Sequence, residues 1–149
     1  MPLSQIGYIN SLQNLPAFIG VESAIATAWL NEHYQEYDTV NFNVRLGQGP
    51  ALPPGSPDYI KKFVRASHAK RADMVLLAGN VATIVEVKLR IGASALGQLH
   101  VYQQLYMQEN PDVKTVKLIA IGVTIEPDVE AILEQNGITV ELFPSIPIP

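Results

Sequence analysis

Two strand-like runs that meet at Gly79-Asn80 constrain this chain more than any other feature. The runs Ala72–Ala78 and Val81–Leu89 are rich in apolar and β-branched residues, and a two-residue Gly-Asn connection favours a tight β-hairpin. Residues equally far from such a turn face each other, and Asp73 and Glu86 stand in that relation. Facing residues hold their Cβ atoms roughly 4.5–5.5 Å apart on one face of the sheet. The hairpin therefore predicts two carboxylates side by side.

The predicted carboxylate pair has the chemistry of a cation site. Two unpaired carboxylates this close repel each other, and hard divalent cations such as Mg²⁺ or Mn²⁺ prefer oxygen ligands. Lys88 follows Glu86 by two positions and shares its strand face, whereas the alternating residues Val85, Val87 and Leu89 are apolar. The pattern predicts an ion site with an amine that holds an oxyanion or orients a water. The alternative is a salt bridge between Glu86 and Lys88 on a solvated edge strand.

Three more side chains are candidates to complete this site. Glu22 lies beside the apolar stripe of an amphipathic helix, and packing of that helix on the sheet would bring it to the site as a metal or water ligand. Otherwise it is an exposed acid near a helix start. Gln98 and Tyr102 are four positions apart in the helix that follows Lys88, so they share a face. They line a polar groove beside the metal or are a partly buried polar pair.

The rest of the chain alternates between helices and strands. Apolar periodicity of about 3.6 predicts helices, and alternating or continuous short apolar runs predict strands. The order helix, strand, strand, strand, helix, strand, helix, strand predicts a single α/β domain over residues 1–149, with a mixed central β-sheet flanked by helices. We expect helices over Ala17–Tyr34 (after Pro16), Ser94–Glu109 (N-cap Ser94) and Glu126–Gln135 (C-cap Asn136-Gly137), and further strands over Thr39–Leu46, Thr115–Val123 and Ile138–Phe143.

A basic stretch precedes Asp73 on an otherwise acidic chain. The formal net charge is −4, yet half of the 10 Lys and Arg residues fall in one window without an acid. Such a patch indicates a confined anionic partner, and the alternative is a solvated lysine-rich loop. The stretch follows a long Gly- and Pro-rich loop, Gly47–Pro57, and we expect a short helical turn over Ile60–His68. Its cations are Lys61, Lys62, Arg65, Lys70 and Arg71.

Composition excludes several classes of protein. The chain has no cysteine, which excludes disulfides, thiolate zinc sites and a cysteine nucleophile. It has no apolar run long enough for a transmembrane helix, and Met1–Ser11 lacks the features of a secretory signal, so we expect a cytoplasmic protein without a membrane partner. His33, His68 and His100 lack metal-ligand spacing. Aromatic residues make up 7%, so no stacking platform for single strands is evident.

The hairpin and its flanking helices resemble the PD-(D/E)xK nuclease superfamily, whose fold has a restriction-endonuclease-like core. The matching pieces are Glu22, Arg71-Ala72-Asp73, Glu86-Val87-Lys88 and the run from Gln98 to Tyr102. The Gln-x-x-x-Tyr helix is similar to the RecB-like and Cas4-like branches. The resemblance covers the chain from about Val21 to Phe143, with one departure, since an alanine stands before the Asp where the family motif has a proline.

The resemblance implies a metal-dependent deoxyribonuclease that hydrolyses DNA phosphodiester bonds and leaves 5′-phosphates, with Mg²⁺ or Mn²⁺ as cofactor and DNA as partner. The cations of the basic stretch would grip DNA phosphates without reading sequence. The implied roles are metal ligation for Asp73, Glu86, the backbone carbonyl of Val87 and, through a water, Glu22; water positioning for Lys88; and support or DNA-backbone contact for Gln98 and Tyr102.

Two other functions stay open on sequence grounds. A non-catalytic member of the same fold would bind DNA or act as a scaffold within a larger DNA-processing complex. An inactive site, however, has no reason to keep the four charges of Glu22, Asp73, Glu86 and Lys88. An unrelated α/β interaction domain would carry these charges as surface ion pairs. For a small nuclease we also expect a homodimer, or a protein partner that supplies substrate choice, and the apolar tail from Phe143 to Pro149 is a candidate interface.

Overall fold

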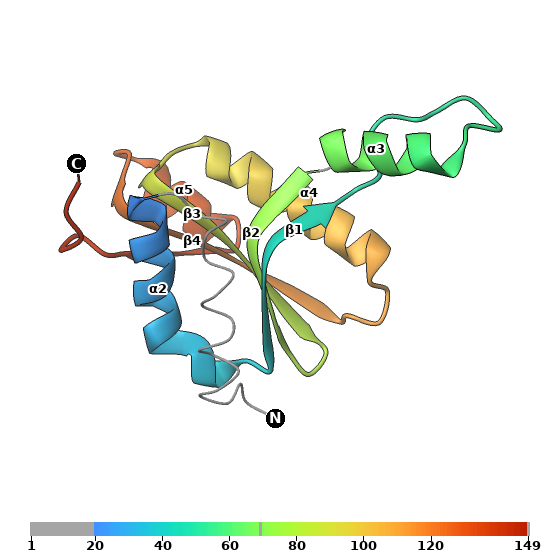
Figure 1. Cartoon of the computed structure of the whole chain (residues 1–149). Coiled ribbons are helices and arrows are strands. Elements are labelled where there is room, and N and C mark those ends of the chain that lie inside the picture. Colours follow the sequence, from blue (N-terminus) through green and yellow to red (C-terminus); the bar gives the residue numbers. More distant parts are fainter. Residues whose placement is uncertain (1–19, 69, 149) are drawn as a thin grey trace.

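The computed structural model describes residues 20–68 and 70–148 as an α/β fold built on one sheet (Figure 1). Within these residues, no helix has the length and apolar character needed to cross a lipid bilayer. The elements in chain order are α2 Val21–His33, the 3₁₀ helix η2 Tyr34–Glu36, β1 Thr39–Leu46, α3 Asp58–His68, β2 Lys70–Ala78, β3 Val81–Ile91, α4 Ser94–Glu109, β4 Thr115–Ile125, α5 Val129–Gln135 and β5 Ile138–Leu142.

A five-stranded mixed sheet forms the middle layer of the molecule, and its spatial order is β1-β2-β3-β4-β5. β1, β2 and β3 are antiparallel neighbours, whereas β4 pairs parallel with β3 and β5 parallel with β4. Parallel neighbours need a crossover, and α4 and α5 supply the two that this sheet requires. The fold class predicted from the order of the elements is confirmed.

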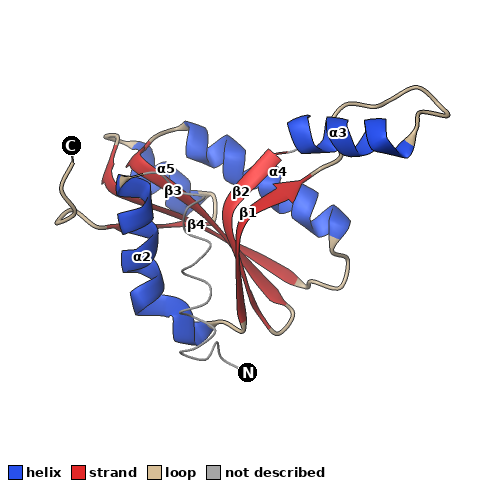
Figure 2. Ribbon diagram, viewed as in Figure 1, coloured by secondary structure: helices blue, strands red, loops and turns tan. Residues whose placement is uncertain are grey.

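Helices cover both faces of the sheet (Figure 2). α2 packs Ile25 and Trp29 against one face, in a cluster that includes Val85 of β3. α4 packs Leu99 against the other face, in a cluster that includes Ile84. Ile84 and Val85 are neighbours in sequence, yet they belong to opposite clusters because successive side chains of a strand point to opposite faces. The central strand β3 is therefore buried on both sides.

The hairpin of β2 and β3 has the predicted turn. Gly79 has φ +61°, which suits the first central residue of a type II′ turn, where glycine is favoured. The paired residues run from Ala78 opposite Val81 to Met74 opposite Val85. This register is the one expected for a two-residue connection, so the predicted alignment of the two strands is confirmed.

Strand β1 departs from the expected alternation. Val40 and Phe42 pack with the α2 cluster, but Val44 packs with the α4 cluster. Between them, Asn43 has φ +51°, a left-handed conformation that breaks the regular pleat and turns the next residue to the other face. The prediction of one apolar side for all three residues is therefore wrong at Val44.

Two helix starts also differ from the predictions. Ser94 is the first helical residue of α4 rather than its N-cap, because Ala93 already has helical dihedral angles and no side chain caps this end. α5 begins at Val129 rather than Glu126, since Glu126 precedes a proline and Asp128 has φ +67°. Both errors arise from local backbone angles that apolar periodicity does not report.

Both ends of the described chain and the basic stretch bring further corrections. α2 begins at Val21, since Gly20 has φ +59°, and the predicted helix start at Ala17, after Pro16, lies outside the described residues. The short helical turn predicted over Ile60–His68 is a full helix, α3, and the last two cations of the basic stretch, Lys70 and Arg71, lie in β2. Near the C-terminus, a turn closed by the bond from Ile146 N–H to the Phe143 carbonyl packs both residues on the α2 cluster. The tail is therefore partly internal rather than simply extended.

Candidate metal centre

The strands β2 and β3 separate where the hairpin reaches its acidic residues. Their pairing ends at Met74 opposite Val85, so Asp73 and Glu86 lie one step past the last pair. In a regular ladder the N–H of Val87 would bond the facing backbone. Instead, it donates a hydrogen bond of 2.8 Å to Asp73 Oδ2. The Asp73 carboxylate thus links the two strands at the point where their backbones part.

Glu86 lies against Asp73 in the interior, with 4% of its surface exposed. A side-chain hydrogen bond joins the two carboxyl groups. Burial, together with the charge of Asp73, raises the pKa of Glu86 to about 8, although Lys88 opposes this rise. Burial also raises the pKa of Asp73, against the hydrogen bond from Val87. At neutral pH the two carboxyls therefore hold a proton between them, because two negative charges this close inside a protein are unfavourable.

Lys88 places a positive charge beside the pair. Its Nζ lies 3.5 Å from Glu86 Oε1, and 33% of its side chain is exposed. β4 passes close to the backbone here: a Cβ atom on Gly122 would lie 2.5 Å from the Lys88 carbonyl oxygen. The alternative, a salt bridge between these two residues on a solvated edge strand, is right about the ion pair and wrong about the strand, because β3 is the central strand and Glu86 is buried.

Glu22 approaches the pair from α2. It is half-buried, and burial together with the charge of Asp73 raises its pKa, whereas Lys88 lowers it. These effects require the three charged groups to lie within electrostatic range of one another. α2 therefore brings Glu22 to the same region as the carboxyl pair.

α4 contributes Tyr102 and Gln98 to this region. Burial, followed by the charges of Glu86 and Asp73, raises the pKa of Tyr102 to about 12, so its hydroxyl stays protonated and available as a donor. Gln98 is half-buried one helical turn earlier. The two polar side chains predicted to share a face of this helix thus lie on the side that meets the sheet.

The donor atoms of this region fit a hard divalent cation. Among the described residues around the pair, Glu86 Oε2 and Gln98 Oε1 are buried without a hydrogen-bond partner. A buried polar atom without a partner is costly, and oxygens of this kind are the ligands that Mg²⁺ prefers. The N–H and the C=O of one strand residue point toward the same neighbouring strand. The Val87 carbonyl therefore points the same way as its N–H, toward β2 and the gap beside Asp73. Two carboxylates and one carbonyl are thus available.

The cations of the basic stretch fall into two groups. Lys61, Lys62 and Lys70 are exposed. Arg65 Nη2 lies 3.3 Å from a carboxylate oxygen of the last residue of α4, and Arg71 donates to a backbone carbonyl of α3 at 3.1 Å. The two arginines therefore connect α3 to its neighbours, and the three lysines are the members of the stretch that face solvent.

A second acidic cluster surrounds His33, far from the hairpin in sequence. His33 Nδ1 bonds Glu36 of η2, and His33 Nε2 lies 3.0 Å from Glu141 Oε2 of β5. Burial lowers the pKa of His33, but the hydrogen bonds to Glu36 and Glu141 outweigh burial, so its pKa is raised. Sequence spacing gave no sign of this cluster, because Glu141 comes 108 positions after His33.

This second cluster also has a geometry that a metal could use. In the part of the chain that the structure describes, Glu32, His33 and Glu141 are a group of side chains close enough to share one ion. Both ring nitrogens of His33 already contact carboxylates, however, and an imidazole that donates from both nitrogens is protonated. A protonated imidazole is not a metal ligand, so we interpret this cluster as an ion pair that ties α2 to β5.

Comparison with known proteins adds a likeness of fold. No family model matches this chain, and no curated protein matches it. Solved structures that are similar include a protein of unknown function, AF1548, at 11% identity and a TM-score of 0.49 over 80% of this chain, and the EndoMS-dsDNA2 complex, at 15% identity and a TM-score of 0.48 over 89%. The chain spans 56% and 48% of those two chains, about half of each. The function proposed next therefore depends on the geometry of the site.

Proposed function

We propose that this chain is a metal-dependent nuclease that hydrolyses DNA phosphodiester bonds and leaves 5′-phosphates. The observation that carries the proposal is the buried pair of Asp73 and Glu86, which has an unpartnered carboxylate oxygen and lies beside the Lys88 amine. Such a set of perturbed groups marks candidate active sites. The same residues carry the resemblance to the PD-(D/E)xK superfamily, with its restriction-endonuclease-like core.

Mg²⁺ or Mn²⁺ would be held by Asp73, Glu86 and the backbone carbonyl of Val87, with Glu22 acting through a water. A divalent ion there would neutralise charge on the phosphate and lower the pKa of a bound water. Metal-ligating carboxyls must be ionised, so Asp73 and Glu86 would give up their shared proton on binding. The buried oxygen of Glu86 that has no partner would then gain one.

The side chains around the carboxyls have distinct proposed roles. Lys88 holds its ammonium group beside Glu86, from where it positions the attacking water and stabilises charge on the scissile phosphate. Tyr102 keeps its hydroxyl proton and donates a hydrogen bond to Glu86 or to a phosphate oxygen. Gln98 supports the site or contacts the DNA backbone through its amide. In this sparsely solvated setting each interaction is stronger than in bulk water.

Contact with DNA would extend from the site to the exposed lysines. Lys61, Lys62 and Lys70 would neutralise phosphates without reading bases. Substrate choice would then come from DNA shape or from a protein partner, and a homodimer would place one site on each strand.

A cleavage panel with linear, circular, single-stranded and branched DNA tests this proposal in Mg²⁺ or Mn²⁺. We expect cutting that EDTA stops, and a Lys88→Ala variant that is slower by about 10²–10³-fold, because it lacks one preorganised donor. Lys117→Ala removes an exposed lysine of the neighbouring strand β4 and should cut at the wild-type rate.

Two results would change the assignment. Cutting by Lys88→Ala in the presence of EDTA would contradict the mechanism. DNA binding without cutting on any substrate of the panel would instead identify a non-catalytic, DNA-binding member of the fold.

A further inference from the structure

α3 and the loop before it project from the body of the molecule (Figure 1). The helices that pack broadly on the sheet are α2, α4 and α5, and α3 has no comparable contact within the described residues. α3 is braced near its base, where Arg65 pairs with Glu109 of α4 and Arg71 of β2 donates to the Ala66 carbonyl. We refer to residues 48–68, the loop and α3 together, as the α3 arm.

One face of the α3 arm presents two aromatic rings to solvent. Tyr59 is 71% exposed and Phe63 is 67% exposed. The two residues are four positions apart, so their rings lie on the same side of the helix. Lys62, three positions after Tyr59, is exposed next to them. Exposed rings beside a cation are the elements with which proteins stack unpaired bases and hold the phosphates between them.

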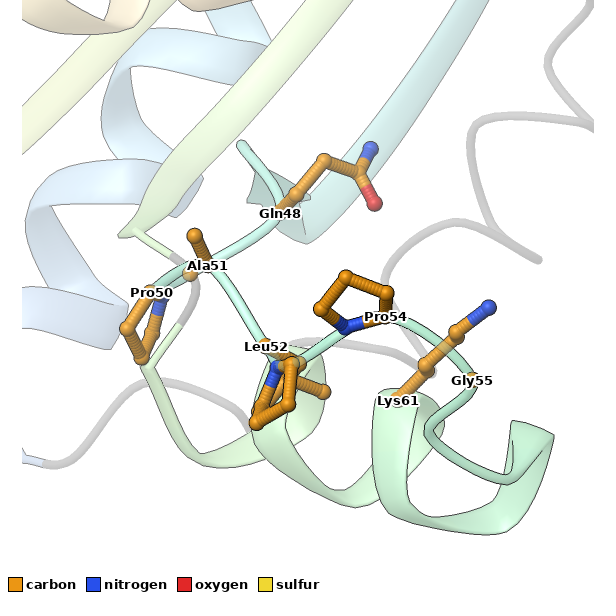
Figure 3. A pocket seen from close by; sticks show the side chains of 9 residues that line it. Gln48, Pro50, Ala51, Leu52, Pro54, Gly55 and Lys61 are labelled. Carbon is orange, nitrogen blue, oxygen red and sulfur yellow. The ribbon is translucent and has the colours of Figure 1, made fainter.

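The loop side of the arm contains a cavity of about 480 Å³ (Figure 3). Prolines, glycines, Ala51 and Leu52 form most of its lining, and its polar side chains are Gln48 and Lys61. This volume lies within the range of small-ligand sites, roughly 300–1,000 Å³. A largely apolar wall with one cation and one amide suits a nucleotide whose base lies on the wall and whose phosphate contacts Lys61.

We propose that the α3 arm binds single-stranded DNA, with bases stacked on Tyr59 and Phe63 and phosphates held by Lys61 and Lys62. The inference rests on the proposed nuclease function and narrows its substrate to DNA that carries an unpaired strand, such as an overhang, a flap or a branch. Bases in a duplex are already stacked on one another, so exposed rings discriminate in favour of unpaired bases.

The connection between the arm and the carboxyl pair supports this assignment. α3 leads directly into β2, and the strand from Lys70 to Asp73 spans roughly 10 Å at 3.3 Å per residue. A strand of DNA held on the arm therefore lies within a few nucleotides of the proposed site of cutting. Lys70, exposed at the start of β2, adds a phosphate contact on this path.

Charge favours DNA over a second copy of the chain as the occupant of this face. The α3 arm contains Lys61, Lys62 and Arg65 and one acid, Asp58, and two further cations follow it at the start of β2. Two arms packed face to face would bring like charges together, whereas a polyanion releases its counterions on binding and gains affinity.

Fluorescence anisotropy on the intact chain tests the inference, with EDTA present so that no DNA is cut. The probes are a labelled mixed-sequence single strand and the duplex of equal length. We expect Tyr59→Ala/Phe63→Ala to weaken single-strand binding by about tenfold or more and to leave duplex binding unchanged. Tyr59→Trp/Phe63→Trp should restore the affinity, and Ile132→Ala, an exposed apolar residue of α5, should have no effect.

The salt dependence of binding measures the phosphate contacts separately. Lys61→Gln/Lys62→Gln should reduce the slope of log Kd against log salt for the single strand by about 1.4, since each phosphate contact contributes about 0.7. An unchanged slope would contradict the proposed role of these lysines.

Several outcomes overturn the inference, and they differ from failure of the nuclease proposal. Unchanged single-strand affinity in the double alanine variant overturns it, as does an equal loss for strand and duplex. Loss of self-association in sedimentation, without a change in DNA affinity, overturns it and assigns the face to contact between copies. If the chain binds single strands through the two rings but cuts no DNA in Mg²⁺ or Mn²⁺, the α3-arm inference is supported and only the nuclease proposal is contradicted.

Discussion

Two groups of carboxylates in this molecule differ in how deeply they are buried. Glu36 and Glu141 hold His33 between them, and their hydrogen bonds raise the pKa of His33, so both negative charges contact one ring. Asp73 and Glu86 face each other in the interior, and burial and mutual repulsion raise the pKa of Glu86 to about 8 even with Lys88 beside it. Each group sets two or more carboxylates beside one cation, so the difference is burial: Glu36 and Glu141 are 58% and 28% exposed, whereas Glu86 is 5% exposed.

The difference separates a structural cluster from a candidate site. A polar network whose partners are all satisfied stabilises the fold and needs no ligand. A buried carboxyl pair with an unpartnered oxygen is unfavourable in the absence of a ligand, and strongly perturbed groups of this kind gather at functional sites. A histidine with three acids nearby resembles a metal site more than two acids do, yet the unpartnered buried oxygen of Glu86 favours the pair.

The largest expected effect that tests this comparison is on metal binding. Glu86→Gln removes a proposed metal ligand and should weaken Mn²⁺ binding, measured by isothermal titration calorimetry. Loss of a residue that only supports a ligand costs about 10–100-fold in metal affinity, so loss of the ligand itself should cost more. Glu141→Gln should leave the affinity unchanged. If Glu141→Gln removes the binding and Glu86→Gln does not, the ion belongs to the histidine cluster and the comparison is reversed.

A smaller effect is expected on stability without metal. The folded-state pKa of Glu86 is raised, so its contribution to stability is present below about pH 4.5 and is lost as pH rises through about 8. The side chain of a Glu86→Gln variant does not ionise, so the variant keeps the stability that the wild type loses at high pH. It should be more stable than the wild type by on the order of 1–3 kcal/mol at pH 8. Urea unfolding in EDTA at pH 5 and pH 8 measures the difference, and a variant less stable than the wild type at pH 8 would contradict the cost of this buried charge.

The smallest effect is expected at the histidine cluster. The folded-state pKa of His33 is raised, so its ion pairs stabilise the protein fully below about pH 6.5 and are lost as pH rises through the raised value. Glu141→Gln should therefore cost about 0.5–1 kcal/mol at pH 6 and less at pH 9. Glu130→Gln, an exposed acid of α5, is the matched control in the same urea titrations. A cost that does not change with pH would mean that Glu141 acts through packing.

Much of the candidate site was predictable because the hairpin is a local structure. Counting outward from Gly79-Asn80 aligns Asp73 with Glu86, and alternation along a strand puts Lys88 on the same face. The bond from Val87 N–H to Asp73 could not be predicted in this way, because it forms only where β2 leaves β3. The errors at Ser94 and at the start of α5 have the same origin, since single backbone angles there override the apolar pattern.

The surface features were the least predictable. An aromatic content of 7% indicated no stacking platform, yet Tyr59 and Phe63 stand exposed side by side on α3. Their periodicity would equally suit a helix that packs on the sheet, and only the position of α3 away from the body leaves them in solvent. Composition averages over the chain and does not report which helix lacks a partner.

The sequence by itself determined the α/β class, the succession of helices and strands along the chain and the alignment of two acids across a turn, because each follows from residues close together in the chain. The tertiary structure alone decided that Glu22 reaches those acids from α2, that Glu141 contacts His33 and that α3 stands apart. These are contacts, or missing contacts, between distant segments. They depend on how the helices pack on the sheet, and local periodicity carries no information about that packing.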